Sequence, residues 1–145
     1  EAFGNRLRSS SITDRTAHPG VLPTEALRAE YDRADVFVLP TRFETCSMAT
    51  REAMARGLPV VACEVGGLPE NFGDAEAGIL VPPDRPKAFS DAIRTLVEDP
   101  EARIRMGEAA LSQSQSFPPW SKAATRFLST LKMLHTTAQN PVDAE

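Results

Sequence analysis

Three short apolar runs alternate with segments of helical pattern, and this alternation constrains the fold more than any other feature. The runs cover residues 36–39, 59–62 and 79–81. None shows the apolar–polar alternation of a strand with one wet face, which predicts strands buried on both faces, as in a parallel sheet. Strict alternation of strand and helix predicts an α/β fold, a Rossmann-like open parallel sheet with right-handed crossovers.

Capping residues predict where the helices begin and end. Thr24, Ser47 and Asp99 each precede a helical pattern as an N-cap would, and Gly57 fits the position just after a helix. Residues 16–18 predict a further, weak strand, and residues 3–10 the end of a helix. The last helix carries an apolar stripe of Trp120, Ala124, Phe127, Leu131 and Leu134.

Length and composition indicate one soluble domain. The 145 residues suffice for a core, and we expect residues 1–136 to form a single α/β domain and residues 137–145 a flexible tail. The 16 basic and 20 acidic residues give a net charge of −4, which argues against a general nucleic-acid binder. No apolar run approaches the roughly 18 residues of a membrane span. The first residues lack the apolar core of a signal peptide, so we expect a cytoplasmic protein.

The two cysteines predict free thiols. Cys46 and Cys63 have no second ligand at CxxC spacing, and His18 and His135 lie far from both in sequence. This pattern predicts neither a disulfide framework nor a metal site. We expect Cys63 in the core and Cys46 partly exposed at a loop–helix junction.

Two glutamates, Glu44 and Glu52, flank the predicted start of the helix after the first apolar run. The first amides of a helix have no intrahelical partner and favour an anion, while carboxylates accept hydrogen bonds from sugar hydroxyls. A ligand with sugar, diphosphate and ribose in line, a nucleotide sugar, would match both. Two plainer alternatives stay open: Glu52 is a solvated helix residue, and Glu44 only caps the helix. Gly66 and Gly67 either let the backbone approach a ligand closely or only form a turn.

Several motifs together resemble a known family. They are residues 34–41, the Glu44-x7-Glu52 pair, and residues 52–62, 66–70 and 78–83. In this order they are similar to the C-terminal, donor-binding domain of family 4 glycosyltransferases of the GT-B fold, over residues 12–131. The resemblance implies one half of a GT-B fold, incomplete at its N-terminus.

The resemblance also implies roles for single residues. Glu44 would be the catalytic residue that holds hydroxyls of the transferred sugar, and Glu52 would hold the ribose. The implied substrate-binding set is Glu52, Thr45, Cys46, Ser47, Met48, Gly20 and Val21, the last two near the base. The family transfers a sugar from a nucleotide sugar with retention of configuration and needs no metal or other cofactor.

The chain departs from the family pattern in two ways. The loop that usually reads Glu-Gly-x-Gly is Glu44-Thr45-Cys46-Ser47 here. A family member would also have an N-terminal acceptor domain and two more strands, with an Arg and a Lys that neutralise the diphosphate. We therefore expect a retaining hexosyltransferase only when the missing N-terminal half or another chain completes the sheet, and peripheral membrane association only through that missing domain. The chain alone would be inactive; alternatively, it is a remnant that binds nucleotide sugar or serves as an assembly module.

Overall fold

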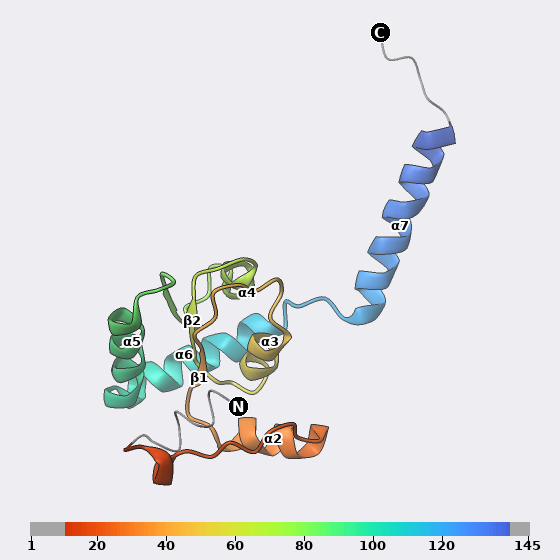
Figure 1. Ribbon diagram of the computed structural model, residues 1–145. Helices are drawn as coiled ribbons and strands as arrows, with labels where there is room; N and C mark the ends of the chain where they lie inside the picture. The colour runs from red at the N-terminus through yellow and green to blue at the C-terminus, as the bar shows by residue number, and fades with distance from the viewer. Residues whose placement is uncertain (1–10, 140–145) are drawn as a thin grey trace. The chain divides into compact units, whose positions relative to one another are not determined.

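The computed structural model describes residues 11–139, and the chain divides between Ala34 and Asp35 into two compact units (Figure 1). The first unit contains a 3-10 turn, η1 (Thr13–Arg15), and the helix α2 (Thr24–Arg33). Pro23 occupies the N-cap of α2 and no side chain caps it, so the predicted cap at Thr24 is wrong. Fixed φ makes proline a suitable residue before the first turn.

The weak strand predicted at residues 16–18 is also wrong. Thr16 has extended backbone after η1, but the structure assigns no strand to these residues. Three residues with a single alanine as their apolar member bury too little surface to hold a strand on a sheet. Residues 3–10, for which the sequence predicts a helix end, lie outside the described residues.

The second unit is built on a parallel sheet of β1 (Phe37–Leu39), β2 (Val60–Cys63) and β3 (Gly78–Val81), in that order. Val61 of β2 stands between Val38 and Ile79 in the register. All four residues of β2 are buried, as predicted, whereas Val38 of the edge strand β1 is 43% exposed. Only the central strand therefore shows the burial on both faces that the apolar runs predict.

Five helices follow the strands: α3 (Met48–Met54), α4 (Leu68–Phe72), α5 (Pro86–Glu98), α6 (Pro100–Ser114) and α7 (Trp120–Gln139). In Figure 1, α5 and α3 lie on opposite sides of the strands, and α6 passes between them. Between α5 and the sheet, Ala92 and Leu96 of the helix form a core with Val61 and Val81 of the strands. The predicted cap of α6 is confirmed, because the Asp99 carboxylate accepts a hydrogen bond from the Ala102 amide at 2.9 Å.

Glycines allow α3 and α6 to approach closely. A Cβ on Gly107 of α6 would lie 2.4 Å from the carbonyl oxygen of Gly57, so a side chain there would collide with backbone. Gly57 itself has φ +70°, the left-handed conformation expected of a residue that follows a helix. This contact holds the C-terminal end of α3 against α6.

The last helix is present where the sequence predicts it, but its apolar stripe is exposed. Trp120 is 79% exposed and Phe127 64% exposed. The helix continues to Gln139, so the first three residues of the predicted tail are helical, and residues 140–145 lie outside the described residues. None of the helices within residues 11–139 is long and apolar enough to cross a bilayer.

Candidate functional site

Glu44 lies in the loop between β1 and α3, with its side chain turned back onto that loop. Its Oε1 atom accepts hydrogen bonds from the Thr45 amide at 3.0 Å and the Ser47 amide at 3.2 Å. The residue is half-buried. The Glu44 carboxylate thus caps the loop that leads into α3. This is the plainer of the two roles that the sequence allows, the other being to bind sugar hydroxyls. It also occupies two of the amides predicted to face a sugar diphosphate.

Ser47 shows how the loop forms without the family's glycines. Its backbone is left-handed, with φ 47° and ψ 78°, a conformation that costs a non-glycine residue about 1 kcal/mol. The buried side chain compensates: its Oγ accepts from the Thr50 amide at 3.4 Å and lies 2.8 Å from the Thr50 hydroxyl. Ser47 is therefore the N-cap of α3, as predicted, and keeps the backbone that a glycine would adopt.

Gly66 and Gly67, in the loop after β2, pack directly on the loop after β1. A Cβ on Gly66 would lie 1.7 Å from the carbonyl oxygen of Glu44, and one on Gly67 would lie 2.1 Å from that of Thr45. Gly66 also has φ +53°. The two glycines thus turn the chain into α4 and admit the close approach of another backbone segment, while an approach to a ligand stays a prediction. The approaching backbone is the loop that carries Glu44.

Asn71, a residue that sequence reasoning missed, extends this contact. It is fully buried on α4; its Nδ2 donates to the Cys46 carbonyl at 2.8 Å and its Oδ1 accepts from Arg51 Nε at 2.8 Å. The Arg51 guanidinium lies 4.7 Å from the ring centre of Phe117. Arg51 is half-buried in this position. The available signal for Asn71 was a polar residue between the apolar residues Leu68 and Phe72 of a short helix.

The other predicted site residues fall into two groups. Thr45, Cys46 and Met48 are exposed around the start of α3, and Glu52 is exposed on the same helix, four residues after Met48 and therefore on the same face. Gly20 and Val21 belong to the first unit, where Gly20 has φ +72° and Val21 is fully exposed. The free thiols match expectation, since Cys46 is exposed and Cys63 buried.

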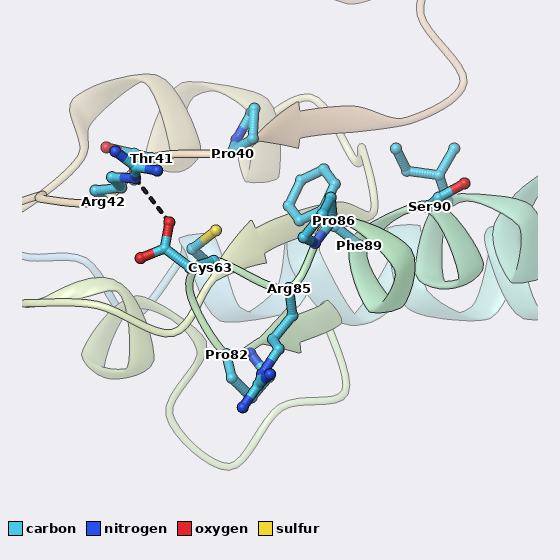
Figure 2. Close-up of a pocket in the computed structure, with 11 residues that line it drawn as sticks. Pro40, Thr41, Arg42, Cys63, Pro82, Arg85, Pro86, Phe89 and Ser90 are labelled. Carbon is cyan, nitrogen blue, oxygen red and sulfur yellow. Dashed lines mark hydrogen bonds and ion pairs between the residues drawn. The ribbon is translucent and has the colours of Figure 1, made fainter.

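A separate cavity of 770 Å³ opens at the carboxyl ends of the strands, beside α5 (Figure 2). Figure 2 shows the Arg42–Asp84 ion pair, 2.8 Å long, next to Cys63, with Pro86 and Phe89 of α5 on another side. Burial, together with the negative charge of Asp84, raises the pKa of the Cys63 thiol. None of the predicted site residues lines this cavity.

Comparison with known proteins decides the family. Residues 4–113 match the family described as Glycosyl transferases group 1. The chain belongs to the group 1 glycosyl transferases. This membership confirms the resemblance drawn from residues 34–83.

Curated relatives in this family are named D-inositol 3-phosphate glycosyltransferase. The protein from Corynebacterium efficiens is 41% identical over 139 residues, which are 96% of this chain and 32% of the relative. The protein from Paenarthrobacter aurescens is 33% identical over 118 residues, 81% of this chain and 29% of the relative. The chain thus spans about a third of the length of these relatives.

Solved structures of the family share the fold. Sucrose-phosphate synthase from Thermosynechococcus elongatus matches 93% of this chain, and 34% of its own, with a TM-score of 0.81 and 29% identity. The C-terminal domain of a group 1 glycosyl transferase from Francisella tularensis matches 68% of this chain and 51% of its own, with a TM-score of 0.62. At 23% identity the second likeness concerns the fold alone. The predicted α/β class, an open parallel sheet of the GT-B type, is confirmed.

The left-handed conformation of Ser47 yields a first prediction. Ser47→Ala removes the cap but keeps the strained backbone, so we expect a loss of about 1 kcal/mol in the free energy of unfolding. Ser47→Gly removes the same cap but relieves the strain, and glycine is itself a tolerated N-cap. We expect the glycine variant to be more stable than the alanine variant by about 1 kcal/mol in urea unfolding. An alanine variant as stable as the glycine variant would contradict the assigned backbone strain.

The contact at Gly66 yields a second prediction, with Gly57 as its matched control. Both glycines have positive φ, but a Cβ at Gly57 would meet nothing closer than 3.7 Å. Gly57→Ala therefore carries the cost of the left-handed backbone alone, about 1 kcal/mol. Gly66→Ala adds a collision with the Glu44 carbonyl, and we expect it to be less stable than Gly57→Ala by a further 1–3 kcal/mol or so in urea unfolding. Equal losses would show that the two loops are not in contact.

Proposed function

We propose that the chain is the donor-binding domain of a retaining glycosyltransferase that moves a sugar from a nucleotide sugar to an acceptor. The observation that carries the proposal is the loop before α3, where the Glu44 carboxylate meets the amides of Thr45 and Ser47. Family membership supports sugar transfer, and Glu44 and Glu52 have the spacing of the E-x7-E pair. In this role no metal is needed. Main-chain donors of the loop, together with the Arg and the Lys expected in the N-terminal part of the complete protein, would hold the diphosphate.

Glu44 is proposed as the catalytic residue, through hydrogen bonds to hydroxyls of the transferred sugar. An ionised carboxylate has about four acceptor sites, and its two bonds to loop amides leave room for sugar hydroxyls. Glu52 is proposed to hold the ribose, because it is exposed on the helix face that also carries Met48. The position of Gly20 and Val21 near the base stays a prediction.

The loop amides are proposed to bind the sugar diphosphate. The amides of Thr45 and Ser47 donate to Glu44 in this structure. A phosphate oxygen that used either amide would compete with the carboxylate, and two negative groups at one donor repel each other. Donor binding at these two amides would require Glu44 to leave them, so we place the diphosphate first at loop amides that Glu44 does not use. Amide donors at Cys46 and Met48 carry no such conflict with Glu44.

Transfer is proposed for the complete protein, which we place in the cytoplasm. The chain spans about a third of its curated relatives, so the similarity bears on the donor-binding part and not on the acceptor in their names. The sheet order places β1 at an edge, where further strands from the N-terminal half or another chain would pair. Any membrane association would come from that further part.

A non-enzymatic module is the second candidate, favoured by the same loop. Its glycines are replaced at positions 45 and 47, and Glu44 already satisfies two of its amides. A loop that is closed upon itself would serve as a rigid surface for assembly. The two candidates differ in a measurable property, the affinity for nucleotide sugars.

Titration calorimetry with UDP-glucose, GDP-mannose and ADP-glucose tests the proposal. We expect heat from at least one donor, and an affinity about tenfold or more weaker in Glu44→Gln and Glu52→Gln, because a hydrogen bond to a charged group contributes roughly 1.5–3 kcal/mol. Glu98→Gln, an exposed glutamate at the end of α5, is the control and should bind as the unchanged chain does. We also expect no nucleotide diphosphate release by this chain alone.

Two results would count against the proposal. Absence of heat with all three sugars would favour the assembly module. Binding that is equally strong in the Glu44, Glu52 and Glu98 variants would place the donor away from the loop before α3.

A further inference from the structure

Three successive carbonyl groups of the loop before α3 lie against a single segment that runs from the end of β2 into α4. The carbonyls of Glu44 and Thr45 are in contact with Gly66 and Gly67, and the next one, that of Cys46, accepts a hydrogen bond from the Asn71 side chain at 2.8 Å. The first two contacts only require the absence of a side chain. The third is directional, so Asn71 sets an orientation that the glycines cannot.

The hydrogen bond from Asn71 acts on Glu44 through one peptide group. The Cys46 carbonyl and the Ser47 amide belong to the same peptide bond, and the described chain has no cis peptide bonds. A trans peptide is planar, so its N–H points away from its C=O. Fixing the Cys46 carbonyl on Asn71 therefore aims the Ser47 amide to the opposite side, where it donates to Glu44 Oε1 at 3.2 Å.

The orientation of the Asn71 amide is itself held by its neighbours. Arg51 can only donate, so the Asn71 oxygen must face Arg51 Nε and the Asn71 nitrogen must face the Cys46 carbonyl. Arg51 is steadied by the Phe117 ring, 4.7 Å from its guanidinium carbon. Gln113 of α6 donates to the backbone carbonyl of Asn71 at 3.2 Å, which ties α4 to the long helix.

We propose that Asn71 is a positioning residue of the donor site, with Arg51 as the group that orients it. By holding the Cys46 carbonyl, Asn71 aims the Ser47 amide and places the Glu44 carboxylate that accepts from it. The effect on donor binding rests on the function proposed above. The effect on the loop does not, because it is a property of the protein without ligand.

Asn71→Asp is the informative variant because it keeps size and shape. Aspartate still accepts from Arg51, but it cannot donate to the Cys46 carbonyl and repels it. Gln113→Ala is the matched control: it removes a hydrogen bond of the same buried network without touching the loop before α3. Arg51→Lys is the second variant, since lysine keeps the charge but lacks the planar guanidinium group that fixes the Asn71 amide.

Amide hydrogen exchange of the ligand-free chain, followed by NMR, tests the loop directly. In Asn71→Asp we expect exchange at Ser47 to accelerate about tenfold or more relative to exchange at Ala55, whose amide donates to the Arg51 carbonyl at the end of α3. In Gln113→Ala the exchange rates of the two amides should rise by the same factor, because this variant lowers only the overall stability. If Asn71→Asp speeds both amides equally, or leaves Ser47 unchanged, Asn71 is only structural and the proposal is overturned.

Calorimetry then measures the consequence for binding. With the nucleotide sugar that the unchanged chain binds, we expect about tenfold weaker affinity in Asn71→Asp and a change of less than about twofold in Gln113→Ala. Unaltered affinity in Asn71→Asp would overturn the role in donor binding. If the unchanged chain binds no nucleotide sugar, the proposed function fails, and the exchange rates still decide whether Asn71 positions the loop.

If Asn71→Asp does not fold, the Ser47 exchange rate in Arg51→Lys decides, and an unchanged rate overturns the proposal.

Discussion

The backbone contact between the loops after β1 and β2 is the constraint on which the candidate site depends. Parallel strands bring their carboxyl ends to one edge of the sheet, and here the first loop lies directly on the second. Gly66 and Gly67 allow the approach, and Asn71 turns it into a defined orientation through the Cys46 carbonyl. Glu44 and the start of α3 take their geometry from this contact.

Local hydrogen bonds explain why the loop tolerates a side chain at Ser47, where the family usually has glycine. Ser47 keeps a left-handed backbone and stabilises it through Thr50. The Ser47 backbone thus takes a conformation that glycine adopts readily, although Thr45 and Ser47 replace both glycines of the family's Glu-Gly-x-Gly loop. Sites that store such strain are typical of functional loops, because surrounding contacts must hold the conformation. The same contacts leave the Glu44 carboxylate bonded to amides that a diphosphate would use.

Local signals predicted much of this fold from the sequence. The three apolar runs gave the three strands, and Ser47, Gly57 and Asp99 marked helix ends, because capping depends on residues only a few positions apart. The strand at residues 16–18 was wrong, since strand formation depends on a partner that the local pattern does not specify. In the candidate site, motif and spacing singled out Glu44 and its loop, and the role of Glu44 towards a donor stays a prediction. The hydrogen bond from Asn71 to the Cys46 carbonyl could not be predicted, because it joins residues 25 positions apart.

We propose that the donor binds at the loop before α3, beside Glu44. The cavity lined by Cys63 and Phe89 is the competing location on the same protein. A crystal structure of the chain with a bound nucleotide sugar measures this most directly. We predict the sugar within hydrogen-bonding distance of the Glu44 carboxylate and the diphosphate at the amides of residues 45–48. A nucleotide sugar seated in the cavity beside α5, with Glu44 still bonded to Thr45 and Ser47, would contradict the account.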